Sequence, residues 1–235
     1  MREEKYTMRK ISTSDTTFFG LVLIMVIGKV IWTSFQLDHP IVQQSINSWV
    51  AIILAAVLGF IALKLAQRTG FPDIWDKRIS NKQRFLIPIL FGLGFAVIQI
   101  ILVALVLHLD IPMVKFPLSI PVYLFGGIIL EIFYRLIPMV FLVWLISNLI
   151  LRKRWQEQVF WVVAILLCLL EPVMQTIGMY QMGIITGILL TAILFIFVFA
   201  GNLIPTYFFR KYGFLAAIVW RLTDYLIWHI IWPLF

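Results

Sequence analysis

Seven long apolar runs dominate this sequence. They cover residues 18–37, 46–66, 85–109, 117–150, 157–176, 183–208 and 213–234. An α-helix rises about 1.5 Å per residue, so about 20 apolar residues cross a hydrocarbon layer about 30 Å thick. Each run is long enough for one crossing. The sequence therefore predicts an all-α, polytopic transmembrane bundle of about seven spans.

The composition supports lipid as the solvent for most of the chain. The 235 residues are 62% hydrophobic and 13% charged, whereas a soluble domain is about 45–50% apolar and about 25% charged. The formal net charge of +8 raises nucleic acid as a partner. Most basic residues, however, lie in short links between apolar runs, and no basic stripe is interleaved with aromatic residues. We therefore expect the lipid bilayer, and no nucleic acid, as a partner.

Successive links between the predicted spans alternate between several basic residues and almost none. Four fall in the N-terminal tail, six between residues 64 and 84, three at 152–154 and two at 210–211. These fifteen share one side, and a single residue, Lys115, falls on the other. Positively charged loops remain cytoplasmic. We therefore expect the N-terminus in the cytoplasm and the C-terminus outside.

The run 117–150 is longer than one crossing requires, at about 51 Å as a helix. Two crossings there would invert the side of every later link and break the charge alternation. We therefore expect one long helix, tilted or bent near Pro138. The alternative is an eighth element, a half-helix at 117–127 that ends at Gly126 and Gly127.

Ionisable residues inside membrane spans are energetically expensive and mark functional sites. Glu131 and Arg135 are four residues apart, so they share a helix face and can pair. Arg221 and Asp224, three residues apart on the last span, can pair in the same way. The alternative to a functional site is that each pair is locally neutralised and stabilises the bundle.

Three spans place a carboxylate or an imidazole at a similar depth. Measured from the cytoplasmic side, Glu131 lies about 28 Å deep, Glu171 about 21 Å and His229 about 24 Å. Carboxylate and imidazole ligands suit zinc and similar divalent ions. We therefore predict a metal site at Glu171 and His229, with Glu131 beside it. The alternative for His229 is an interfacial position in an aromatic belt with Trp228 and Trp232.

Three segments resemble the CPBP family of membrane proteins, also called Abi or CAAX-protease-like proteins. Gly127 to Arg135 resembles its first motif, in which two glutamates, three residues and an arginine follow one another. Residues 208–217 resemble the approach to its last motif, and 65–72 resemble a linker that precedes the conserved part. This resemblance divides the chain into an N-terminal three-span region, 1–110, with a cytoplasmic tail and a basic loop, and a CPBP-like four-span core, 111–235.

Characterised members of the family are metal-dependent or glutamate-dependent proteases of prenylated or peptide substrates, and others protect bacteria against bacteriocins. The resemblance implies a bacterial cell membrane as the location. It also implies that Glu131 matches the second glutamate of the motif and that Arg135 orients it. Leu130 replaces the first glutamate, and Glu171 stands where the second motif has histidine. The histidine of the third motif is missing, so His229 would have to replace it.

Three functions follow as expectations. The first is an intramembrane hydrolase of a membrane-associated peptide or protein, with Glu131 or Glu171 as base, His229 as metal ligand or base, and Arg135 orienting Glu131. The second is an inactive relative that serves as an immunity factor or scaffold. The third is a small transporter or proton relay that uses Glu131, Glu171 and Asp224. Glu171 near His229 at a water-filled cavity would favour the hydrolase, whereas Glu131 closed onto Arg135 in a dry bundle would favour the scaffold.

Overall fold

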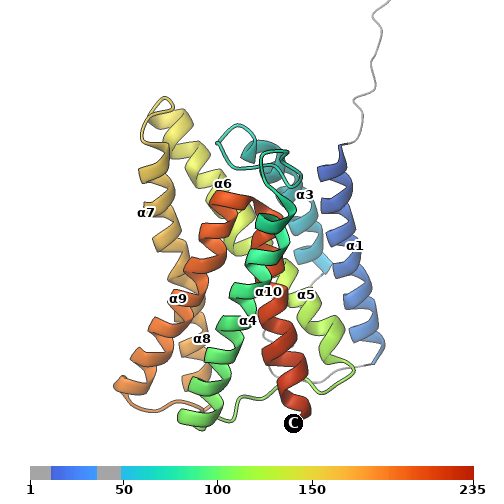
Figure 1. Ribbon diagram of the computed structural model, residues 1–235, viewed down its shortest axis with the longest axis vertical. Helices are drawn as coiled ribbons and strands as arrows, with labels where there is room; N and C mark the ends of the chain where they lie inside the picture. Colours follow the sequence, from blue (N-terminus) through green and yellow to red (C-terminus); the bar gives the residue numbers. More distant parts are fainter. Residues whose placement is uncertain (1–11, 36–48) are drawn as a thin grey trace, which may run out of the picture.

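The computed structural model describes residues 12–35 and 49–235. Within these residues there is no strand, and seven helices are long and apolar enough to cross a membrane. The predicted all-α bundle of seven spans is therefore confirmed. The basic residues of the N-terminal tail and the link 38–45, which enter the predicted orientation, lie outside the described residues. The described chain begins at one end of the bundle and finishes at the other (Figure 1).

Several spans join α-helical and π-helical segments, which are labelled α and η. The first three spans are α1 (Thr13–Ser34), α3 (Trp49–Ala66), and η1 (Lys82–Leu86) with α4 (Ile87–Gln99) and η2 (Ile100–Val106). The fourth is α5 (Ser119–Glu131), η3 (Ile132–Leu136), α6 (Ile137–Val143) and η4 (Trp144–Ile150). The fifth is α7 (Gln156–Cys168) with α8 (Leu170–Gln181), and the sixth is α9 (Ile188–Tyr212). The seventh is α10 (Phe214–Tyr225), η5 (Leu226–Ile231) and a short 3₁₀ turn, η6 (Trp232–Leu234).

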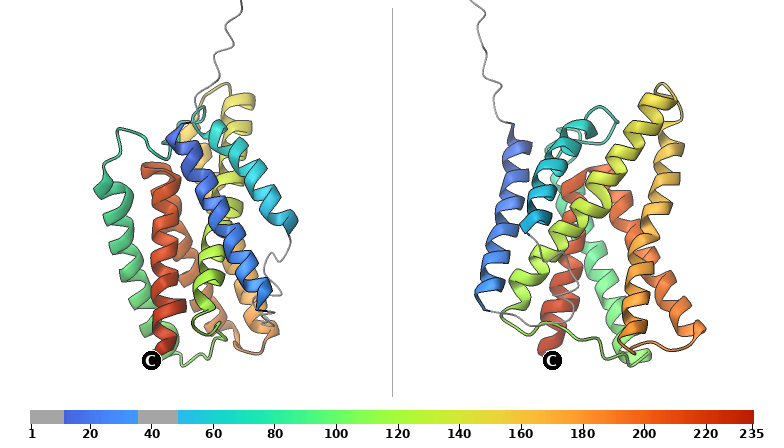
Figure 2. Two further views of the ribbon diagram at one scale, coloured as in Figure 1. Left: turned by 90° about the vertical axis from the view of Figure 1, so that its right-hand side faces the viewer. Right: turned by 180° about the vertical axis from the view of Figure 1, so that it is seen from behind.

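The fourth span is one continuous helix of 32 residues, as predicted. Gly126 and Gly127 lie inside α5, so no half-helix ends there. The π-helical segment η3 ends two residues before Pro138, which cannot donate a backbone hydrogen bond to the preceding turn. Figure 2 shows this span crossing the bundle obliquely. The oblique path accommodates a helix that is longer than the membrane is thick.

The sixth span begins later than the sequence predicts. We expected it from residue 183, but α9 starts at Ile188. Gly183 and Gly187 both have positive φ, at 71° and 83°, and they belong to the turn before the helix. Glycine adopts this backbone conformation without the steric penalty of a Cβ atom.

The outer surface of the bundle is apolar. Large aliphatic side chains on α3, such as Ile53, Val57 and Ile61, are more than half exposed. Such an exposed apolar band is stable only against hydrocarbon. The lipid bilayer is therefore the surrounding medium of this protein.

The link between α3 and η1 is bonded to the first turns of α1. Ser14 Oγ donates to Asp73 Oδ2 at 2.6 Å, and Trp75 Nε1 donates to Thr17 Oγ1 at 2.7 Å. Within the link, the Arg78 guanidinium donates to the Asp76 carboxylate and lowers the pKa of Asp76 to about 2. The charged link is thus an ordered surface segment at one end of the bundle.

The seventh span lies at the centre of the bundle, and it packs closely against α4 and α5 (Figure 1). At Gly92 of α4, an added Cβ atom would lie 2.9 Å from both Thr223 Cβ and the backbone oxygen of Trp220. At Gly127 of α5, it would lie 2.8 Å from Leu222 Cδ2. Small residues at helix crossings allow this close approach in membranes. These two contacts bring α10 within side-chain reach of the polar residues on α5.

We expect Gly92→Ala to lower the free energy of unfolding by about 1–3 kcal/mol, because the added methyl group meets backbone that cannot move aside. Gly94→Ala is the matched control, since no atom lies within 4 Å of its added Cβ. Alanine also favours the helix by up to about 1 kcal/mol, so this control should unfold at the same temperature as the wild type or above it. Thermal unfolding in detergent measures both variants. Equal melting temperatures for the two would contradict the close α4–α10 packing.

Candidate functional site

A buried ion pair on the fourth span forms the first part of the site. Glu131 is the last residue of α5 and Arg135 lies in η3, so four residues separate them along one helix face. Arg135 Nη1 donates to Glu131 Oε1 at 2.5 Å. Both side chains are almost completely buried. The predicted Glu131–Arg135 pair is therefore present.

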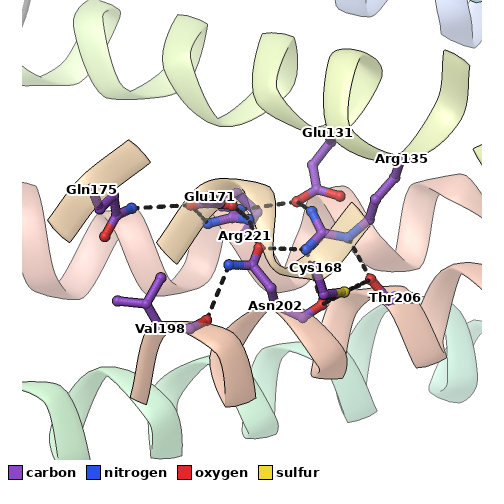
Figure 3. Close-up of polar contacts among 9 residues, drawn as sticks. All are labelled: Glu131, Arg135, Cys168, Glu171, Gln175, Val198, Asn202, Thr206 and Arg221. Carbon is purple, nitrogen blue, oxygen red and sulfur yellow. Dashed lines mark hydrogen bonds and ion pairs between the residues drawn. The ribbon is translucent and has the colours of Figure 1, made fainter. Parts of the chain in front are cut away.

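Arg221 of α10 connects this pair to the fifth span. Its Nε donates to Glu131 Oε1 at 2.9 Å. Its Nη1 and Nη2 donate to the two carboxylate oxygens of Glu171 at 3.0 and 2.9 Å. This bidentate contact is the geometry in which a guanidinium binds a carboxylate most strongly. Figure 3 shows Arg221 between Glu171 and Glu131.

Helix α9 completes the network with uncharged groups. Asn202 Oδ1 accepts hydrogen bonds from Arg135 Nη2 at 2.8 Å and from Arg221 Nη2 at 3.0 Å. Thr206 Oγ1, one turn further on, accepts from Arg135 Nε at 3.0 Å. Gln175 of α8 donates to Glu171 Oε1 at 3.2 Å. Four spans thus meet at a single hydrogen-bonded cluster, which we call the arginine–glutamate network.

The network is balanced in charge. It contains two carboxylates, Glu131 and Glu171, and two guanidinium groups, Arg135 and Arg221. Burying a single charge at this depth is very unfavourable, and a paired, hydrogen-bonded set avoids most of that penalty. Glu131 Oε2 is the one carboxylate oxygen of the network that is buried without a hydrogen-bond partner. The network therefore joins the helices without leaving net charge in the membrane interior.

The remaining candidate residues lie outside the network. His229 lies in η5, eight residues after Arg221, which corresponds to about 12 Å along a helix. Its ring stacks on Tyr123 at a centroid distance of 4.2 Å and meets the edge of Tyr225 at 4.8 Å. The hydrogen bonds of Glu171 go to Arg221 and Gln175, so His229 is not among its partners.

Asp224 does not form the local pair that its spacing suggests. The Arg221 guanidinium, three residues earlier, is directed to Glu131 and Glu171 instead. Asp224 is buried, and its Oδ1 atom has no hydrogen-bond partner. Within residues 12–35 and 49–235, no three side chains of the His, Cys, Asp or Glu type are arranged to hold a metal ion. The zinc site at Glu171 and His229 stays a prediction.

Three contributions to the network were not predicted. Arg221 connects the fourth and fifth spans. Asn202 accepts hydrogen bonds from both arginines, and Thr206 accepts one from Arg135. The available signal was the four-residue spacing of Asn202 and Thr206 within an apolar run, which places both on one helix face. Polar residues on a shared face of a membrane helix indicate contact with another helix.

The network leaves little room for other molecules. A cavity of about 10 Å³ beside it is lined by Tyr134, Arg135, Met139, Leu167, Cys168, Asn202 and Thr206. This volume holds one water molecule at most.

A separate groove of about 290 Å³ runs between α5 and α10, and its walls are apolar except for the hydroxyl groups of Tyr123 and Tyr225. The charged groups are therefore bonded to one another and largely closed off from solvent.

We expect Arg221→Met to lower the free energy of unfolding by about 3–5 kcal/mol, because Glu171 would lose its guanidinium partner inside the bundle. The double variant Glu171→Met/Arg221→Met should recover part of that loss, since it leaves the Glu131–Arg135 pair intact. Unfolding in detergent with increasing denaturant measures all variants.

Arg78→Met is the control for this experiment. Arg78 pairs with Asp76 at 2.6 Å in the link between α3 and η1, where the Arg78 side chain is 82% exposed. Loss of a pair with such an exposed arginine costs at most about 1 kcal/mol. If Arg221→Met were as stable as Arg78→Met, the network would not stabilise the bundle.

Comparison with other proteins does not extend this picture. No family model matches the chain, and no curated protein or solved structure gives a significant match. The resemblance to the CPBP family remains a prediction that rests on the short segments quoted above.

Proposed function

We propose that this chain is a non-catalytic membrane protein with a CPBP-like helical core, which serves as an immunity factor or scaffold. The observation that carries this proposal is the position of Arg221. Its guanidinium lies between Glu131 and Glu171 and bonds to both oxygens of Glu171, the carboxylate that would have to bind a metal ion together with His229.

The chemistry of the arginine–glutamate network supports a structural role. A general base must present a free lone pair to the water that it activates. Both oxygens of Glu171 accept bonds from Arg221, and Oε1 of Glu131 accepts bonds from two guanidinium groups. Arginine remains protonated in proteins, so it neither accepts a proton nor ligates a metal. Arginine thus engages both oxygens of Glu171 and one oxygen of Glu131, which disfavours either carboxylate as the base of a hydrolase.

A second candidate is the intramembrane hydrolase, and one observation favours it. Glu131 Oε2 is buried and has no hydrogen-bond partner. In this alternative Glu131 would act as base, Arg135 would orient it, and Glu171 and His229 would hold a zinc ion. Arg221 would have to leave both carboxylates before a metal or a substrate peptide could enter.

Cleavage of a membrane-tethered reporter peptide by the reconstituted protein separates the two candidates. We expect no cleavage by the wild type, by Glu131→Gln or by Glu171→Gln, because both carboxylates are engaged by arginine. We also expect the same zinc content in the wild type, in His229→Ala and in the control His108→Ala. Cleavage by the wild type that disappears in a folded Glu171→Gln variant would overturn the non-catalytic proposal.

Protection of expressing cells against a bacteriocin is the complementary readout. For a non-catalytic protein, protection should follow the amount of folded protein in the membrane. The double variant Glu171→Met/Arg221→Met should therefore protect better than either single variant. Normal folding of the double variant with complete loss of protection would instead indicate that these charges act directly.

A further inference from the structure

We propose that the loop between η4 and α7, residues 151–155, binds the phosphate group of an anionic membrane lipid. The loop carries Arg152, Lys153 and Arg154 in succession, followed by Trp155. All four side chains are exposed. This proposal does not depend on the function of the arginine–glutamate network, which lies deeper in the bundle.

The structure adds a fourth cation that is far away in the sequence. Asn148, near the end of η4, donates through Nδ2 to the backbone oxygen of Arg68 at 3.0 Å. Gln156, the first residue of α7, donates through Nε2 to the backbone oxygen of Thr69. These two bonds hold the turn that follows α3 against the residues on either side of the loop. Arg68, whose side chain is exposed, therefore lies beside the segment that carries the three cations of residues 152–154.

Among residues 12–35 and 49–235, no acidic side chain pairs with this cluster. The nearest carboxylate along the chain, Glu157, is occupied by Arg210, whose Nε and Nη2 donate to Glu157 Oε2 at 3.0 and 2.7 Å. None of the four cations has an ion pair within the described residues. Clustered cations without counter-charges attract anionic headgroups electrostatically.

The loop is held in one unusual conformation. Arg152, Lys153 and Trp155 have φ angles of 51°, 66° and 57°, and they are three of the four non-glycine residues with positive φ in the described chain. Lys153 N donates to Ser147 O at 2.8 Å, and Ser147 Oγ donates to Arg154 O at 3.2 Å. Such strained backbone persists only where the surroundings enforce it, and it is concentrated at binding sites. The backbone that carries the cations is thus held in one conformation before a ligand arrives.

The side chains around the loop place it at the boundary between hydrocarbon and headgroups. Leu149 and Ile150, directly before the loop, are 61% and 63% exposed. Trp155, directly after the cations, is 70% exposed. Exposed aliphatic residues require lipid, and tryptophan prefers the membrane–water interface. Cations bracketed in this way lie at the depth of the lipid phosphates, which is why we assign the ligand to a lipid.

Fluorescence quenching at Trp155 by brominated lipids tests this site. The protein is reconstituted in phosphatidylcholine with brominated phosphatidylglycerol or with brominated phosphatidylcholine. The contribution of Trp155 is the difference between the wild type and Trp155→Phe. We expect this contribution to show a preference of roughly tenfold for phosphatidylglycerol, since each nearby cation adds to the attraction.

Two triple variants separate a local site from general surface charge. Arg152→Gln/Lys153→Gln/Arg154→Gln should abolish the preference, whereas Lys77→Gln/Lys82→Gln/Lys211→Gln should retain it. The control removes three exposed cations from other segments and changes the net charge equally. Melting temperatures measured in parallel show that both variants are folded. An equal preference in the two variants, or no preference in the wild type, would overturn the proposal.

Soluble phosphate distinguishes a lipid site from a site for a free anion. We expect inorganic phosphate to reduce the preference for phosphatidylglycerol no more than chloride does at the same ionic strength. If the loop does not bind free phosphate, both salts act only by screening the charges. Displacement by inorganic phosphate well beyond that produced by chloride would show that the loop binds a free anion instead of a lipid headgroup.

Discussion

A charge inside a membrane bundle is tolerated only when an opposite charge and sufficient hydrogen bonds surround it, and this constraint organises the centre of the protein. Glu131 and Arg135 satisfy part of it within one helix. Glu171 has no such partner on its own span, so Arg221 of α10 must approach it. The positions of the fourth, fifth, sixth and seventh spans follow from this requirement, because each contributes groups to the same cluster.

Close helix packing makes that cluster possible. An arginine side chain reaches only a limited distance from its backbone, so α10 must lie near both α5 and α8. Gly92 and Gly127 leave the space in which α4 and α5 contact α10 without intervening side chains. Packing and electrostatics therefore depend on each other, since the glycines permit the approach and the ion pairs maintain it.

The spans and the Glu131–Arg135 pair could be predicted because both depend on local properties of the sequence. Hydrophobic length identifies a span, and a four-residue separation identifies a shared helix face. The partner of Glu171 could not be predicted in this way. Depth in the membrane can be counted along a helix, but the direction in which a side chain points depends on the neighbouring helices. Arg221 and Asp224 illustrate the difference, because their spacing allows a local pair while the bundle directs Arg221 elsewhere.

The order of the spans along the chain has a consequence for biogenesis. Synthesis proceeds from the N-terminus, so the span that carries Glu171 enters the membrane before the one that carries Arg221. Glu131 has Arg135 beside it from the start, whereas Glu171 must wait for two further spans. Until then the growing chain holds an uncompensated acid in or near the bilayer. Completion of the seventh span is thus the step that commits the nascent bundle to its final arrangement.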